Sequence, residues 1–191
     1  MRSLTAAVAV ALMLSPGAGL LADTPLSDAP VLAVWAPESL RFTFLGFTAK
    51  YSCDGLQEKM RRTLLKLGAR ADLNVQWTGC AGGISRPNPF PGVAVKMFVL
   101  RPASEQDVAA GHTVPARWRT VDVNAGRDPL DAAGDCELTE QIKQRILPKF
   151  TTRNVEYRST CIPNQLTVGG TQLKAEVLVA EAGAPTPQAK P

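Results

Sequence analysis

Oxygen-bearing side chains gather in the segment DVNAGRDPLDAAGDCE, residues 122–137. Carboxylate and amide oxygens are the ligands that Ca²⁺ prefers. The spacing differs from an EF-hand loop, because Gly126 occupies the fifth position, where that loop has a side-chain ligand. We favour a polar insertion before a helix, with Asp135 capping free backbone amides. A calcium site is the alternative, and its candidate ligands would be Asp122, Asn124, Asp128 and Asp131.

Other catalytic groups are few. His112 is the only histidine, and no Gly-x-Ser-x-Gly motif accompanies it. A metal site with several histidine ligands is excluded, and a Ser-His-Asp triad would depend on this one histidine. We therefore predict a solvated histidine, no cofactor and a protein that is not an enzyme. The rival hypothesis is a secreted hydrolase, calcium-dependent or not, that uses the carboxylates of residues 122–135.

Four cysteines frame two segments with the same layout, residues 51–80 and 134–161. In each segment a helical pattern follows one cysteine and a strand pattern precedes the other. In a right-handed strand-helix-strand crossover, the helix begins and the second strand ends at the same edge of the sheet. This geometry predicts one disulfide within each segment, whereas metal binding or redox exchange is the alternative role. The predicted bridges are Cys53–Cys80 and Cys136–Cys161.

The loop GCAGGISRPNPFPG follows the first segment and is the predicted binding loop. Cys80 anchors its start, and its prolines restrict the backbone. Phe90 and Arg86 would then offer an apolar contact and a charge at a low entropic cost of ordering, and Asn88 is the third candidate residue of the loop. The alternative is an ordered turn without a ligand, and a purely structural module is the third possibility for the chain.

Two similar sets of elements must position these residues. In the first set, residues 41–51 read as a strand with a bend at Gly46, followed by a helix with Leu56, Met60 and Leu64 on one face. Strands are predicted over 73–78 and 93–100. On the opposite face of the helix we expect a solvent-exposed basic stripe of Lys59, Arg62, Lys66 and Arg70.

The second set has the same order: a strand over 117–123, a helix over 137–147 ended by Pro148, and strands over 154–160 and 171–179. We predict an α+β protein of two strand-helix-strand-strand units, ferredoxin-like in element order, each closed by one disulfide. Internal duplication is the favoured origin, and convergence on a common layout is the alternative.

The N-terminus indicates export. Arg2 precedes an apolar run that ends at Ser15-Pro16-Gly17, which is typical of a signal peptide. The predicted organisation is a signal peptide over 1–22, a spacer and apolar arm over 23–40, the first unit over 41–100, a linker over 101–116, the second unit over 117–180 and a disordered tail over 181–191.

Composition limits the classes of partner. The net charge of +4 is too small to favour nucleic acid as a partner. The N-terminal apolar run is too short to span a bilayer, and we expect no membrane span in the mature chain. We therefore expect a periplasmic or secreted, non-catalytic binding or accessory protein. Its partner would be an unidentified protein or an envelope polymer.

Overall fold

The computed structural model describes residues 29–47, 49–123, 136–162 and 170–181, and within them the protein is an α+β fold. Helix α3, Cys136–Gln141, continues directly into a π-helical turn, Ile142–Ile146, and a 3₁₀ turn, Leu147–Lys149. In chain order the elements are β1 Val31–Thr43, α1 Cys53–Lys66, β2 Asn74–Thr78, β3 Gly92–Pro102, α2 Glu105–Ala109, β4 Val114–Asp122, α3 Cys136–Gln141, β5 Thr152–Ser159 and β6 Thr171–Ala180.

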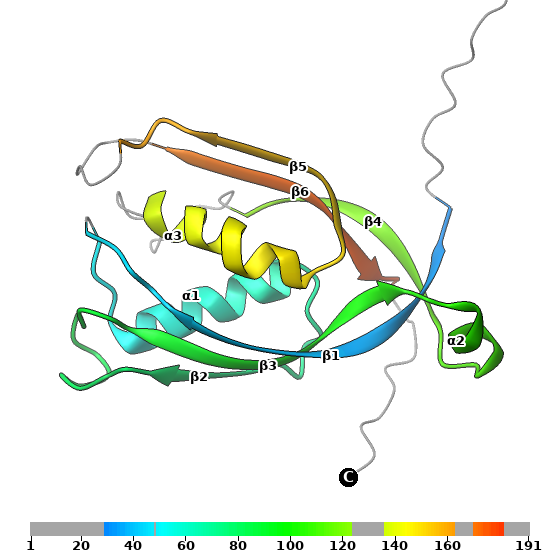
Figure 1. Cartoon of the computed structure of the whole chain (residues 1–191), viewed down its shortest axis with the longest axis horizontal. Coiled ribbons are helices and arrows are strands. Elements are labelled where there is room, and N and C mark those ends of the chain that lie inside the picture. Colours follow the sequence, from blue (N-terminus) through cyan, green and yellow to red (C-terminus); the bar gives the residue numbers. More distant parts are fainter. Residues whose placement is uncertain (1–28, 48, 124–135, 163–169, 182–191) are drawn as a thin grey trace, which may run out of the picture.

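The strands form one six-stranded antiparallel sheet in the order β2-β3-β1-β4-β6-β5. Each half of the chain contributes a strand, a helix and two further strands. Outward from the β1–β4 junction, the strands follow in the order β1, β3, β2 in the first half and β4, β6, β5 in the second. The junction is short, because β1 pairs with β4 only where Val31–Ala33 meet Val114–Ala116. Beyond it the two halves of the sheet diverge (Figure 1).

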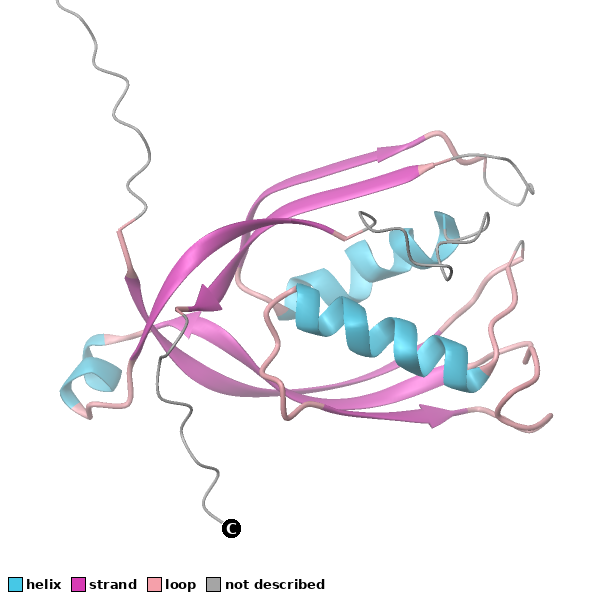
Figure 2. Ribbon diagram, turned by 180° about the vertical axis from the view of Figure 1, so that it is seen from behind, coloured by secondary structure: helices cyan, strands magenta, loops and turns pink. Residues whose placement is uncertain are grey.

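Helices α1 and α3 lie between the diverging halves of the sheet (Figures 1 and 2). Apolar side chains from both halves form one buried cluster, which includes Phe42, Leu56, Met60, Leu138 and Ile146. A smaller cluster lies at the crossing of the strands and contains Ala33, Leu100, Val114, Ala116 and Leu178. The two sets of elements therefore share a sheet and a core.

Strand β1 differs from the prediction. The apolar arm and the beginning of the strand expected over 41–51 form one continuous strand from Val31 to Thr43, so the strand ends before Gly46. Its ladder against β3 runs from Ala33–Pro102 to Thr43–Gly92. Pro37 is tolerated in this ladder because β4 no longer pairs with β1 at that position.

The remaining strands and helices occur near the predicted residues. The segment predicted as a linker, 101–116, contains the end of β3, the short helix α2 and the beginning of β4. In the described part of the chain, no helix is long and apolar enough to cross a membrane.

Candidate functional site: the disulfide-anchored loop end

Both disulfides lie at the end of the molecule where β1, β2 and β5 end and the first residues of α1 and α3 begin. Cys53 is bonded to Cys80 and Cys136 to Cys161, with Cα–Cα distances of 6.2 and 6.1 Å, which confirms the predicted pairing. β1 and β2 run in the same direction with β3 between them, so the start of α1 and the end of β2 meet at one edge. We call this region, residues 44–47, 49–52, 79–91 and 160–162, the loop end.

The first turn of α1 is where segment 79–91 docks. The backbone N–H groups of Cys53 and Asp54 both donate to the carbonyl of Ile84, at 2.9 and 3.3 Å. Ser85 donates its hydroxyl to the Asp54 carboxylate at 2.9 Å. The loop therefore supplies a hydrogen-bond acceptor for the first backbone N–H groups of the helix, which have no acceptor within the helix itself. Hydrogen bonds from Ser52 and Ser85 lower the pKa of Asp54.

Ser52 is the N-cap of α1, and its hydroxyl accepts a hydrogen bond from Gly55 N–H at 3.3 Å. Asp54 and Gln57 have the spacing of a capping box, but Ser52 and not Asp54 is the N-cap. Gln57 instead donates its side-chain amide to the carbonyl of Val75 at 2.7 Å, which ties α1 to β2.

Asn88, one of the three candidate residues of the binding loop, holds the backbone of that loop. Its side chain is buried, with 1% exposed. Its amide nitrogen donates to the carbonyls of Gly83 and Arg86 at 2.9 and 2.7 Å, and its amide oxygen accepts from Gly82 N–H at 3.2 Å. Its backbone N–H donates to the Tyr51 carbonyl at 3.0 Å, which joins two segments of the loop end.

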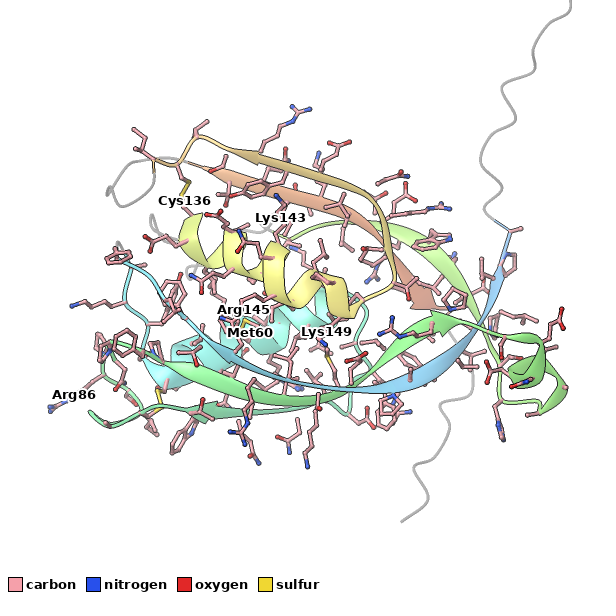
Figure 3. The ribbon with its side chains drawn as sticks, viewed as in Figure 1. Met60, Arg86, Cys136, Lys143, Arg145 and Lys149 are labelled. Carbon is pink, nitrogen blue, oxygen red and sulfur yellow. A yellow bond between two sulfur atoms is a disulfide. The ribbon has the colours of Figure 1, made fainter. Side chains whose placement is uncertain are left out.

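Arg86 and Phe90 are both exposed, as a role in binding requires. Phe90 is 61% exposed, and Arg86 projects outward at the tip of the molecule (Figure 3). Gly79, which begins the segment, has a φ of 73°, and a Cβ there would lie 2.6 Å from the carbonyl oxygen of Phe90. The close approach of backbone to backbone thus fixes both ends of segment 79–91.

Leu45 and Phe47 belong to the same surface, although neither was predicted as a site residue. They are 57% and 83% exposed. Gln141 of α3 accepts from Leu45 N–H at 3.1 Å and donates to the Leu45 carbonyl at 2.7 Å, and Glu137 accepts from Phe47 N–H at 2.9 Å. The sequence signal was the pair of apolar residues around Gly46, just beyond a strand.

An open groove of about 410 Å³ lies between this segment and α3. Arg145 is one of its lining residues, and its guanidinium donates to the carbonyl of Thr43 at 3.1 Å and lies 5.1 Å from the centre of the Phe42 ring. The groove is lined by Leu45, Phe47, Glu137, Glu140, Gln141, Gln144 and Arg145.

Exposed apolar side chains concentrate at the loop end. Among the described residues, nine large apolar side chains are exposed, and six of them lie at or next to this end: Leu45, Phe47, Trp77, Ile84, Phe90 and Ile162. The other three, Leu32, Val108 and Val155, lie elsewhere on the fold. A concentration of this kind on a folded protein is typical of an interaction site.

The calcium candidates are only partly within the described structure. Asp122 ends β4 and accepts a hydrogen bond from the Gln172 amide at 2.8 Å. Asn124, Asp128 and Asp131 lie outside the described residues. Within the described ranges, no group of three His, Cys, Asp or Glu side chains could hold a metal ion. His112 is exposed in the turn between α2 and β4.

Arg70 corrects the predicted basic stripe on α1. The helix ends at Lys66, and Arg70 is buried in the turn before β2 with 7% exposed. Its guanidinium lies 3.8 Å from the centre of the Phe98 ring and forms hydrogen bonds of 2.8 and 2.7 Å to both carboxylate oxygens of Asp72. Stacking and a bidentate ion pair give this arginine a structural role.

Comparison with known proteins supplies no relative: no protein-family model, no curated protein and no solved structure matches this chain. The fold and the loop end define an α+β protein with an apolar, disulfide-anchored surface, and its function has to be inferred from its own residues.

Proposed function

We propose that this chain is an exported, non-catalytic binding or accessory protein of the cell envelope or extracellular space, which engages its partner through the loop end. The observation that carries the proposal is the concentration of exposed apolar side chains at or next to the loop end, six of the nine in the described residues. Burying them against a partner would release water from apolar surface, which is the main favourable term in association.

The rigidity of the loop end supports this role. Cys53–Cys80 fixes the beginning of segment 79–91, Asn88 holds its middle, and Gln141 and Glu137 hold the backbone of Leu45 and Phe47. Side chains presented from an already ordered backbone lose less conformational entropy on binding. Such a surface is suited to recognition rather than to a closing lid.

Several carboxylates have structural partners that account for their properties. Neighbouring side chains donate hydrogen bonds to Asp54, Asp72, Asp107 and Glu176, and these bonds lower the pKa of each group. A carboxyl group with a lowered pKa is ionised at neutral pH and is a poor general acid. These four residues therefore stabilise local structure and do not favour a catalytic role.

Export and duplication are part of the same proposal. Two disulfides are typical of proteins outside the reducing cytoplasm, and residues 1–22 have the order of a signal peptide. The common element order of the halves and the symmetric strand order support an origin by duplication of a ferredoxin-like strand-helix-strand-strand unit. Each disulfide then joins equivalent positions in its half.

A photo-crosslinking experiment tests the proposed surface. A benzophenone amino acid is placed at Phe90, and separately at Val108, which is 47% exposed on α2 at the opposite end of the fold (Figure 1). In cells that naturally produce the protein, we expect a discrete crosslinked product from position 90 and none from position 108. Equal products from both positions, or none from position 90, would show that the loop end is not the binding surface.

A further inference from the structure

The charged residues of the two first-half segments at the loop end are all basic. Segments 44–52 and 79–91 contain Lys50 and Arg86 and no aspartate or glutamate. Both side chains are exposed, and they accompany the exposed aromatic rings of Phe47 and Phe90. We infer that the loop end docks on the surface of a lipid bilayer that contains anionic headgroups, with Phe47 and Phe90 entering the apolar boundary. The inference rests on the proposed function, because it assigns the partner of the same surface.

The two phenylalanines suit a hydrocarbon environment. A phenyl ring has no polar atom, so burying it among lipid chains leaves no unsatisfied hydrogen-bonding group. Phe47 and Phe90 are 83% and 61% exposed, and each stands on a different anchored segment. Aromatic and aliphatic side chains at the acyl boundary, with Lys and Arg beside them, are typical of proteins that lie on a membrane without spanning it.

The backbone next to the inserted residues is already hydrogen-bonded. Gln141 binds both the N–H and the C=O of Leu45, and Glu137 binds the N–H of Phe47. Backbone groups that lack partners cost several kcal/mol in hydrocarbon. Because these groups have partners within the protein, the segment can approach the bilayer without that penalty. The same hydrogen bond holds the Glu137 carboxylate against the backbone of Phe47.

Charge distinguishes the loop end from the other end of the fold. Lys50 and Arg86 would lie at headgroup level, where each basic residue near an anionic surface contributes about 1 kcal/mol, equivalent to about a fivefold change in binding. Val108 at the opposite end has Glu105 and Asp107 in the same short helix. An anionic membrane would repel that end, so the basic loop end is the end that fits it.

Three acidic side chains on α1 and α3 border the loop end, and they weaken the attraction to an anionic surface. Asp54 accepts a hydrogen bond from Ser85, and Glu137 is held by Phe47 N–H. Glu140 is exposed one turn further along α3, where Gln144 donates to it at 3.2 Å. We therefore expect reversible, salt-sensitive binding, because a few inserted side chains and two cations give only modest affinity.

Vesicle co-sedimentation tests the inference. The purified, disulfide-oxidised protein is mixed with vesicles of phosphatidylcholine, with and without about a quarter phosphatidylglycerol. We expect sedimentation with the anionic vesicles, reduced by salt and weaker with phosphatidylcholine alone. The double variant Phe47→Ser/Phe90→Ser should lower the partition coefficient by at least about tenfold. The matched control Val108→Ser should leave it unchanged.

A second pair of variants separates insertion from simple charge attraction. Lys50→Gln and Arg86→Gln should each lower binding to anionic vesicles about fivefold, while Arg117→Gln, an exposed cation on β4, should not. If the basic residues matter and the phenylalanines do not, the protein only adsorbs by charge, and the inference is wrong. Circular dichroism and thermal melting verify that every variant is folded.

The two proposals fail in different ways. No association with anionic vesicles at low salt, together with a persistent crosslink from position 90 to a protein, would overturn the membrane inference and leave the loop end as a protein-binding surface. Equal loss of vesicle binding in the Phe47→Ser/Phe90→Ser and Val108→Ser variants would also overturn it. Crosslinks that do not depend on position would instead refute the proposed function itself.

Discussion

Asn88→Ala is expected to loosen the loop end and lower the free energy of unfolding by about 2–3 kcal/mol. The substitution removes three side-chain hydrogen bonds, to Gly82, Gly83 and Arg86. Each such bond contributes about 1 kcal/mol to stability, and the carbonyls that lose their donors add a desolvation cost where they stay buried. Because Cys80 still anchors the loop, we expect part of the loss to be local.

Asn88→Asp is nearly isosteric and should be more harmful at neutral pH. Its carboxylate would face the carbonyl oxygens of Gly83 and Arg86, where the native amide donates at 2.9 and 2.7 Å. Burial and these acceptors would raise the pKa of the new carboxyl group in the folded protein. A raised folded pKa means that stability falls as the pH rises above the unfolded value of about 4, so the deficit should grow from acidic to neutral pH.

Urea unfolding followed by tryptophan fluorescence measures the stability of both variants, and amide hydrogen exchange at Gly82 reports on the loop. The control is Asn74→Ala on β2, which is exposed and should change stability by less than about 0.5 kcal/mol. If Asn88→Ala behaves like the control and exchange at Gly82 is unchanged, this side chain does not order the loop. The argument from rigidity would then be refuted.

Three further changes test other contacts. Replacing Cys53 and Cys80 together by serine removes the link across 27 residues and should lower the free energy of unfolding by about 3.5 kcal/mol in the loop-entropy description, as measured by urea unfolding without reductant. Gln141→Leu should cost about 1–2 kcal/mol in the same assay, because both backbone groups of Leu45 lose their partner. The hydrogen bond from the Arg70 guanidinium lowers the pKa of Asp72 in the folded state, so the stability that this carboxylate contributes is lost as the pH falls through the lowered pKa. The melting temperature of Asp72→Asn should therefore fall less on acidification than that of the native protein.

Each of these changes has an outcome that would contradict its reasoning. A double serine variant as stable as the native protein would show that the disulfide does not restrict the unfolded chain. For Gln141, the control is Gln144→Leu, because the Gln144 amide donates to the exposed side chain of Glu140 and not to the backbone of Leu45. Equal losses in both glutamine variants would remove the backbone argument. An unchanged acid dependence in Asp72→Asn would show that the ion pair adds nothing to stability.

Much of the fold could be predicted from local patterns. The spacing of Leu56, Met60 and Leu64 predicted the buried face of α1, and all three are fully buried. The disulfide pairing followed from the position of each cysteine relative to its helix and strand. These features depend on neighbouring residues in the sequence and on the handedness of a short crossover.

Other features depend on contacts between distant parts of the chain. Arg70 has the spacing of a helix-surface residue, but the chain leaves the helix before it, and Phe98 and Asp72 bury it. Asn88 lies in a segment whose prolines and glycines are typical of an exposed turn, yet its side-chain amide is hydrogen-bonded to three backbone groups. A sequence shows which side chains are polar, but their partners depend on how the loops fold back.

Of the segments that form the loop end, the sequence predicted only segment 79–91 as a binding surface. Segment 79–91 stood out because its prolines, glycines and cysteine mark an ordered loop. Leu45 and Phe47 did not, because they were assigned to a strand that in fact ends at Thr43. Their backbone is held by side chains on α3 that lie 96 and 90 positions away in sequence.

The short ladder between β1 and β4 means that the two halves are joined more by packing than by strand pairing. Their connection, residues 103–113, lies at the crossing of the strands and includes the exposed Gly111. The surfaces that join the halves are the ladder, the shared core and the helices, and none of them requires an unbroken chain. Continuity of the backbone then acts chiefly as a high effective concentration. We therefore expect the two halves to dock on each other during folding much as the subunits of a dimer associate.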